Sequence, residues 1–195
     1  SIVANWKVLD YVSLPYMEKV LFAGEVMPVK QLNYWRKKMP ELLYANLYGP
    51  TEVTDICAYY IVDRDFADSE TLPIGRACDN CDLIILREDG TEAAPGEIGE
   101  LCVRGSFVAG GYYGDPDKTG AAFIQNPLNP WYPEKIYKTG DLVRYNDRGE
   151  LLYLGRRDFQ IKHMGYRIEL GEVEAAAGAA SDVKSCVSIY DEVHD

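Results

Sequence analysis

The segment Tyr48-Gly49-Pro50-Thr51-Glu52 follows directly after the apolar run 42–47 and carries several groups that suit a nucleotide. An aromatic ring can stack on a base, a hydroxyl and turn amides can hold a phosphate, and a carboxylate can hold Mg²⁺. The same letters also fit a Gly-Pro turn with a capping threonine and a solvated glutamate. Spacing alone leaves both interpretations open.

A second carboxylate lies in Lys138-Thr139-Gly140-Asp141, which we interpret as a tight turn before another β stretch. A carboxylate fixed in this way can accept two hydrogen bonds from a vicinal diol, which is how acidic residues hold ribose. Thr-Gly-Asp is also a common polar turn, and without other evidence that interpretation is favoured.

The segment 156–167 holds Arg156, Arg157, Lys162 and Arg167 against one acid, Asp158. Because the whole chain is acidic, such a concentration of positive charge favours an anionic ligand, although a solvated hairpin stays open. The two histidines have no acid, cysteine or serine at a telling position. The sequence therefore predicts no protein nucleophile.

The chain has 195 residues, 31 acidic and 20 basic side chains and a net charge of −11. This acidity argues against non-specific binding to nucleic acid or to an anionic membrane surface. No apolar run approaches the roughly 20 residues that span a bilayer. Five irregularly spaced cysteines suit reduced thiols in a cytoplasmic protein, and Cys78-x-x-Cys81 has no second pair that would complete a zinc site.

The first fifty residues predict strand, helix and strand, over 20–23, from Pro28 onward and over 42–47. Apolar residues form one helical stripe at Leu32, Trp35 and Met39. Two strands joined by a helix form a parallel pair, so the loops 24–25 and 48–52 should converge at the edge where open α/β sheets bind ligands.

Further along the chain, turn signals at 89–90 and 148–149 separate short alternating runs, which predict antiparallel strands. These runs cover 83–86, 98–103 and 150–154. Six glycines between Gly96 and Gly114 favour a small twisted sheet or distorted barrel. After Gly155 we expect a hairpin with its turn at 163–165, a helix over 172–180 and a strand over 183–189.

Five segments, taken together and in order, resemble the adenylate-forming superfamily. They are Phe22-Ala-Gly-Glu25, Asn46-Leu-Tyr-Gly-Pro-Thr-Glu52, Gly99-Glu-Leu-Cys-Val-Arg-Gly105, Tyr137-Lys-Thr-Gly-Asp-Leu142 and 155–174. The proline of Gly-Pro-Thr-Glu and the run Ile168-Glu-Leu-Gly-Glu-Val-Glu174 are most similar to amino-acid adenylation domains of nonribosomal peptide synthetases and to D-alanine–carrier-protein ligases.

The resemblance implies that ATP and a carboxylic acid, in this branch an amino acid, give an acyl-adenylate (acyl-AMP) and pyrophosphate, after which a phosphopantetheine thiol of a carrier protein takes the acyl group. Such a displacement at phosphorus needs positioning and charge neutralisation more than a nucleophile.

The resemblance also implies a role for each nucleotide-binding residue. Tyr48 would stack on adenine with Gly49 beside it, Thr51 would contact phosphate, and Glu52 would bind Mg²⁺. Asp141 would hold the ribose, Tyr153 would lie near the nucleotide, and Arg156 would reach the ribose or α-phosphate.

The resemblance also implies that Asp158 is the hinge of a mobile C-terminal domain, and that Lys162 and the Gly165 loop reach the active site for thioester formation. The acyl pocket would be lined by Leu21, Ala23, Gly24, Leu47, Asp55 and Ile56. The expected fold is α/β: the end of a parallel α/β subdomain (1–70), a β-rich barrel-like subdomain (71–157), and the beginning of a small, truncated α+β domain (158–195).

Three family elements have no counterpart in the chain: a Ser/Thr/Gly-rich loop ending in Pro-Lys, a C-terminal lysine, and an upstream helix with an acidic residue. We therefore expect a piece of an enzyme of roughly 500 residues, inactive alone. Two alternatives stay open. One is an acyl- or aryl-CoA ligase, with CoA as acceptor, and the other is a non-catalytic module that binds a nucleotide or a partner protein.

Overall fold

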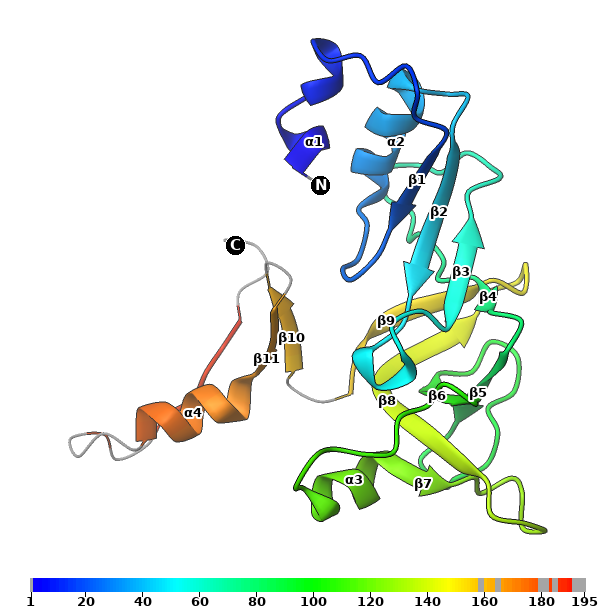
Figure 1. Ribbon diagram of the computed structural model, residues 1–195, viewed down its shortest axis with the longest axis vertical. Helices are drawn as coiled ribbons and strands as arrows, with labels where there is room; N and C mark the ends of the chain where they lie inside the picture. The colour runs from blue at the N-terminus through cyan, green and yellow to red at the C-terminus, as the bar shows by residue number, and fades with distance from the viewer. Residues whose placement is uncertain (1, 158–159, 164–165, 179–182, 184–185, 191–195) are drawn as a thin grey trace. The chain divides into compact units, whose positions relative to one another are not determined.

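The computed structural model describes residues 2–157, 160–163, 166–178, 183 and 186–190 (Figure 1). The chain divides into two compact units, Ser1–Gly155 and Arg156–Asp195. The first unit begins with a short helix α1 (Ile2–Asn5) and a 3-10 turn η1 (Val8–Asp10).

A four-stranded sheet follows, in the order β1-β2-β3-β4. Its strands are β1 (Lys19–Phe22), β2 (Leu43–Tyr48), β3 (Ala58–Ile61) and β4 (Arg76–Ala77). β1 and β2 are parallel and the other two pairs are antiparallel. The helix between β1 and β2, α2 (Val29–Lys38), begins after an extended Pro28. The predicted strand–helix–strand unit is confirmed.

The helix α2 covers one face of this sheet because its apolar stripe needs a partner. Leu32 is fully buried and Trp35 nearly so. The Tyr44 ring stacks on Phe22, with centroids 6.3 Å apart, and its hydroxyl donates to the carbonyl of Trp35 at 3.0 Å and of Met39 at 2.9 Å. These bonds tie β2 to the C-terminal end of the helix α2.

A second, antiparallel sheet has the order β5-β6-β8-β7, with β9 on β8. Its strands are β5 (Cys81–Leu86), β6 (Gly99–Gly105), β7 (Phe123–Gln125), β8 (Lys135–Tyr145) and β9 (Leu151–Arg156). A helix, α3 (Pro116–Ala122), precedes β7, and Asp115 caps it by accepting from the Lys118 amide. The predicted β-rich subdomain is confirmed as a curled half-barrel.

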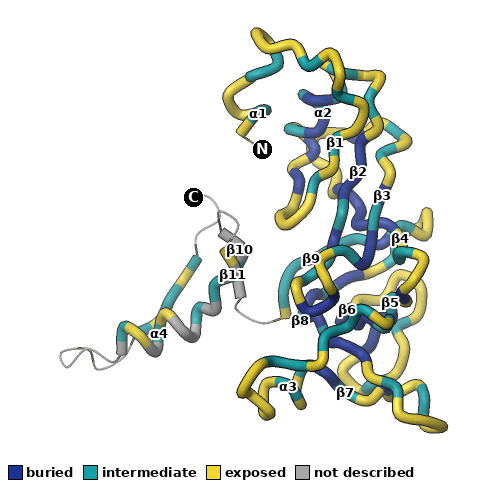
Figure 2. The backbone as a smooth tube through the Cα atoms, in the orientation of Figure 1, coloured by how far each residue is buried: buried dark blue, intermediate teal, exposed yellow. Residues whose placement is uncertain are grey.

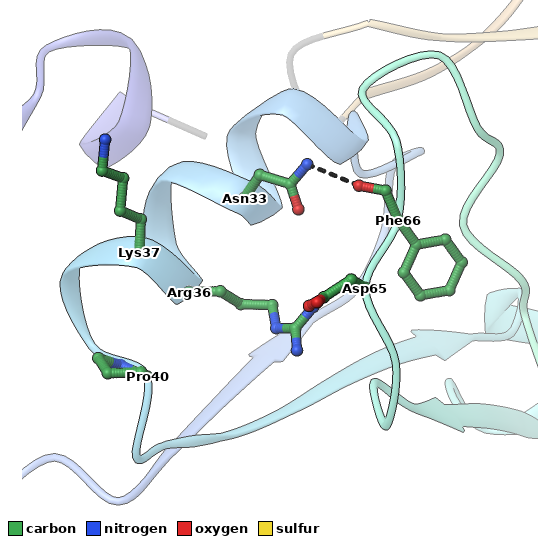
Figure 3. A pocket seen from close by; sticks show the side chains of 6 residues that line it. All are labelled: Asn33, Arg36, Lys37, Pro40, Asp65 and Phe66. Carbon is green, nitrogen blue, oxygen red and sulfur yellow. Dashed lines mark hydrogen bonds and ion pairs between the residues drawn. The ribbon is translucent and has the colours of Figure 1, made fainter.

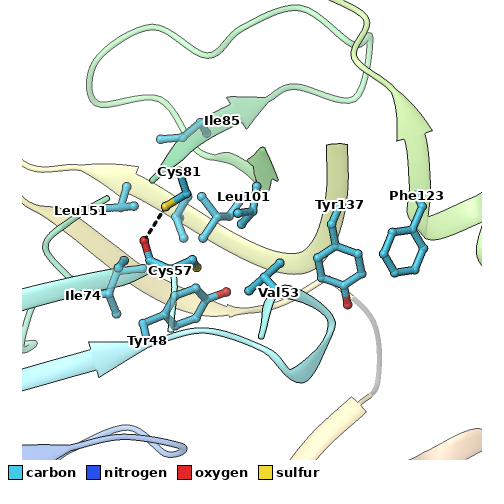
Figure 4. Packing of buried hydrophobic residues seen from close by; sticks show 13 residues of the cluster. Tyr48, Val53, Cys57, Ile74, Cys81, Ile85, Leu101, Phe123, Tyr137 and Leu151 are labelled. Carbon is cyan, nitrogen blue, oxygen red and sulfur yellow. Dashed lines mark hydrogen bonds between the residues drawn. The ribbon is translucent and has the colours of Figure 1, made fainter. Parts of the chain in front are cut away.

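One core joins the two sheets (Figure 4). Tyr48, Val53 and Cys57 come from the end of β2 and the loop after it, and they pack in one cluster with Leu101 of β6 and Tyr137 of β8. Buried residues run along β2 and β8 (Figure 2). The loop that holds most of the candidate nucleotide residues is therefore part of the core rather than a free surface turn.

A half-buried carboxylate ties the β8–β9 hairpin to the first sheet. Glu150 accepts from the Tyr60 hydroxyl at 3.0 Å and forms an ion pair with Arg64 at 3.4 Å. Burial by itself raises the pKa of Glu150, but hydrogen bonds from Asn146, Arg64 and Tyr60 outweigh it and hold this pKa below its usual value. The ionised form therefore stabilises the fold.

Because the pKa of Glu150 is depressed by folding, its contribution is present above the unfolded value of about 4.3 and is lost as the pH falls through the folded value. We expect Glu150→Gln to be less stable than the wild type at pH 7, and this difference to shrink below about pH 4.3. Urea unfolding at pH 7 and pH 3.5 measures it, with the exposed Glu41→Gln as control. An equal difference at both pH values would contradict the assignment.

The second unit contains β10 (Gln160–His163), β11 (Tyr166–Glu169) and α4 (Leu170–Gly178). The two strands are antiparallel, as predicted for the hairpin. The strand predicted over 183–189 is wrong: none of its described residues is in a strand. An extended segment becomes a strand only by pairing, whereas the Ser188 amide donates to a side chain, Glu174 Oε1, at 2.8 Å.

Candidate functional site

The loop after β2 folds back on itself within eight residues. The Cys57 amide donates to the Tyr48 carbonyl at 2.9 Å, and the 3-10 turn η2 (Thr51–Val53) buries Val53 completely. A side chain at Gly49 would overlap the Asp55 carbonyl oxygen and lie 2.8 Å from Ile56 Cα. The loop closes because Gly49 has no Cβ, which explains the glycine after the tyrosine.

Tyr48 and Asp141 meet where the two sheets join. The Tyr48 hydroxyl donates to Asp141 Oδ2, although the two residues are 93 positions apart. Tyr48 is 8% exposed and Asp141 3% exposed. Burial first, and then the negative charge of Asp141, raise the pKa of Tyr48 well above its ordinary value. The phenol therefore stays neutral and acts as a donor.

The ring of Tyr153, on β9, lies 6.5 Å from that of Tyr48, at an interplanar angle of 40°. Adenine and ribose are joined covalently, so a ring that stacks on one and a carboxylate that holds the other must be neighbours. The structure brings together Tyr48, Asp141 and Tyr153, three residues that were predicted from separate segments.

Asp141 does not lie in a tight turn, and that prediction is wrong. Thr139, Gly140 and Asp141 are inside β8, where they form a bulge: between the pairs Glu100–Leu142 and Cys102–Lys138, only Leu101 of β6 faces these three residues. Gly140 has a φ of 75°, a backbone conformation that glycine adopts without strain. A glycine at this position suits a tight turn as well as a bulge, and the sequence therefore predicted a turn.

Polar contacts hold this bulge in shape. Thr139 Oγ1 donates to the Leu101 carbonyl at 2.8 Å and accepts from the Asp141 amide at 3.0 Å. Glu100 accepts from the Gly140 amide at 3.2 Å and forms an ion pair with Lys138 at 3.2 Å. Asp141 is thus fixed by residues on both strands, of which Glu100 was not foreseen from the sequence.

Glu52 lies in η2 and is 9% exposed. Its Oε1 accepts from the Tyr112 hydroxyl at 2.8 Å, and its backbone carbonyl accepts from the Ala109 amide at 2.9 Å. The neighbouring Thr51 is exposed. Sequence reasoning missed Tyr112 because its contact with Glu52 spans 60 residues; the glycines on both sides of Tyr112-Tyr113 were the one available signal.

Glu52 fits a magnesium ligand that is completed by a substrate. Mg²⁺ prefers hard oxygen donors, and proteins commonly supply one or two carboxylates while phosphates and water supply the rest. In the part of the chain that the structure describes, no cluster of three or more acidic, histidine or cysteine side chains forms a metal cage. Glu52 would hold the ion, which would neutralise phosphate charge.

Two predicted pocket residues, Leu21 and Leu47, share a face of the first sheet. Leu21 pairs with Ala45 in the parallel register, so Leu47, two residues on, points to the same side, opposite the face that α2 covers. Leu21 is 58% exposed. Of the other predicted pocket residues, Ala23, Gly24 and Asp55 are exposed and Ile56 is half-buried. Their role as an acyl pocket stays a prediction.

Four residues of the prediction, Arg156, Asp158, Lys162 and Gly165, belong to the second unit, and their roles stay predictions. Arg156 ends β9 and begins that unit. Lys162 lies in β10, paired with Arg167, but only its backbone is described. The predicted hinge, Asp158, and Gly165 lie outside the described residues.

An open hollow of about 420 Å³ lies beside α2 and holds none of the candidate residues (Figure 3). It is lined by Asn33, Arg36, Lys37, Pro40, Asp65 and Phe66. Arg36 and Asp65 pair across it at 3.0 Å, and Asn33 donates to the Phe66 carbonyl at 2.9 Å. These contacts join α2 to the 63–68 segment, so we interpret the hollow as structural.

Comparison with known proteins agrees with this geometry. Residues 4–113 match the family described as "AMP-binding enzyme", and the chain belongs to this family of adenylate-forming enzymes. Among helices of the described residues, none has the length and apolar character to cross a membrane.

Among individual relatives, the D-alanine–D-alanyl carrier protein ligase of Bacillus cytotoxicus is 40% identical over 177 residues, which are 90% of this chain and 34% of that protein. The solved structure of holo-PA1221, a nonribosomal peptide synthetase protein with adenylation and PCP domains, matches with a TM-score of 0.84 and 31% identity over 92% of this chain and 31% of that chain.

The Vibrio cholerae adenylation domain AlmE, solved with glycyl-adenosine-5'-phosphate, matches with a TM-score of 0.81 and 29% identity, over 98% of this chain and 36% of that chain. This chain therefore spans about a third of the length of each of these three proteins.

Proposed function

We propose that this chain is part of an ATP-dependent ligase that activates an amino acid as its acyl-adenylate and transfers it to the phosphopantetheine thiol of a carrier protein. The observation that carries the proposal is the contact between Tyr48 and Asp141, which places an aromatic ring and a carboxylate side by side. The proposal is also supported by membership of the AMP-binding family, by the carrier-protein ligase relative, and by the similarity to AlmE, which was solved with glycyl-adenosine-5'-phosphate.

In the first half-reaction, a carboxylate oxygen of the amino acid attacks the α-phosphorus of ATP, and the bond from that phosphorus to the bridging oxygen breaks as pyrophosphate leaves. Tyr48 stacks on adenine, Asp141 holds the ribose hydroxyls and Thr51 contacts phosphate. In the second, the thiol takes the acyl group and AMP leaves. Positioning and charge neutralisation carry both steps, so no protein nucleophile is needed.

We assign the remaining roles in the same way. Leu21, Leu47 and Ile56 line the acyl pocket together with their neighbours in the loops after β1 and β2. Arg156 contacts the nucleotide, Asp158 acts as the hinge, and Lys162 acts during thioester formation. The need for ATP fits a cytoplasmic location.

The acceptor is tested by offering the complete enzyme, ATP and an amino acid either a phosphopantetheinylated carrier protein or free CoA. We expect mass spectrometry to show the aminoacyl group on the carrier protein and not on CoA. Rapid formation of a CoA thioester, with an unloaded carrier protein, would favour a CoA ligase instead.

We expect the 195-residue chain on its own to give no ATP–pyrophosphate exchange, because nothing in its sequence resembles the family's loop for the β- and γ-phosphates. Exchange is measured with the purified chain and with the complete enzyme at equal concentrations. Robust amino-acid-dependent exchange by the chain alone would show that it needs no further segment.

A further inference from the structure

Tyr112 lies outside the five segments that carry the resemblance, and its hydroxyl contacts Glu52, the carboxylate assigned to the cation. Its hydroxyl donates to Glu52 Oε1 at 2.8 Å, across 60 residues of sequence. Glu52 is 9% exposed and Tyr112 is half-buried, so this hydrogen bond is partly shielded from water. A neutral phenol that donates to a carboxylate fixes its direction without cancelling its charge.

The segment 107–112 holds the Glu52 loop at two further points. The Ala109 amide donates to the Glu52 carbonyl at 2.9 Å. Thr54 Oγ1 donates to the Phe107 carbonyl at 2.8 Å. Backbone and side chain of the Glu52 turn are thus fixed by the same short segment.

Tyr112 is itself anchored. Its ring meets Phe123 edge-on, with centroids 5.5 Å apart at 72°, and Phe123 is buried at the start of β7. The Tyr112 amide donates to Oγ1 of Thr119, on α3, at 2.9 Å. The Tyr112 side chain is therefore held in place by the ring packing and by the hydrogen bond of its own amide, so the phenol oxygen is not a mobile surface group.

We propose that Tyr112 is a positioning residue that orients the Glu52 carboxylate for a Mg²⁺ ion carried by ATP. The proposal rests on the function proposed above. Mg²⁺ demands near-ideal octahedral geometry, so a small rotation of its carboxylate ligand weakens binding, and hydrogen bonds to ligands commonly tune metal affinity.

Tyr112→Phe in the complete enzyme removes the hydroxyl and keeps the ring against Phe123. At fixed ATP we expect the Mg²⁺ concentration for half-maximal adenylate formation to rise about tenfold, while the KM for the amino acid is unchanged. Tyr113→Phe is the matched control, because Tyr113 is fully exposed and the same hydroxyl is removed one residue away.

A Tyr112→Phe enzyme with the wild-type Mg²⁺ midpoint would overturn the proposal. The same holds if the rate of adenylate formation falls by an equal factor at every Mg²⁺ concentration, because the loss of a merely structural residue has that effect. Should Tyr112→Phe fail to fold, Thr54→Ala, at an exposed position, tests the same clamp by the same shift, and an unchanged midpoint there overturns it. If the wild-type enzyme forms no adenylate at any Mg²⁺ concentration, the proposed function fails instead.

Discussion

Replacing Gly49 by alanine in the complete enzyme should lower kcat/KM for adenylate formation by about a hundredfold or more. The new Cβ would overlap the Asp55 carbonyl oxygen and lie 2.8 Å from Ile56 Cα. Both obstacles are backbone atoms, so no side chain can rotate out of the way.

The loop must therefore move to relieve the overlap with the new side chain. On one side the loop is fixed by the Cys57–Tyr48 backbone bond, and in the middle by the fully buried Val53. Any shift of this loop displaces Tyr48 or Glu52, and a displacement of about 1 Å can cost a hundredfold in rate.

The control for Gly49→Ala is Gly120→Ala. Gly120 lies in α3, and nothing lies within 4 Å of the position of its Cβ. Alanine has a helix propensity about 1 kcal/mol better than glycine, so this variant should be as active as the wild type and at least as stable. Thermal unfolding and steady-state kinetics of both variants make the comparison. A fully active Gly49→Ala enzyme would show that the close approach at this glycine is dispensable.

Replacing Asp141 by alanine should raise the KM for ATP by about ten- to a hundredfold, because two hydrogen bonds to a charged group are lost. We expect kcat to change less, since the 2'- and 3'-hydroxyls of the ribose take no part in the displacement at the α-phosphorus. Asp141→Asn, which keeps an acceptor for the Tyr48 hydroxyl, should show a smaller effect.

The ribose role of Asp141 has a specific readout besides KM. The wild-type enzyme should prefer ATP to 2'-deoxy-ATP, and Asp141→Ala should largely lose this preference, which a general structural defect would not cause. Asp147→Ala, in the exposed turn between β8 and β9, is the control. An unchanged KM for ATP, or an intact preference for the ribonucleotide, would remove Asp141 from the ribose.

The parallel pair β1–β2 and the helix between them were predictable because their signals are local. Two short apolar runs and one helical stripe between Pro28 and Pro40 are enough to define a strand–helix–strand unit. Tyr48 and Asp141 were each identifiable by motif, and the structure adds that they touch. That contact depends on how the two sheets pack, which no local pattern records.

The failures have the same cause. Gly140 signals a positive φ, which serves a turn and a bulge equally well, and the bulge is decided by Leu101 and Glu100 on the neighbouring strand. The segment 183–189 has the letters of a strand, but its described residues pair with no other strand. Tyr112 escaped notice because only the folded chain brings it to Glu52.

The most direct test of the proposed activity is ATP–pyrophosphate exchange by the complete enzyme over a panel of amino acids and of matched carboxylic acids without the amino group. We predict that one amino acid, or a few, supports rapid exchange and that the matched acids do not. Exchange supported equally by acids without an amino group, or by no amino acid at all, would contradict the assignment of this chain to an amino-acid-activating ligase.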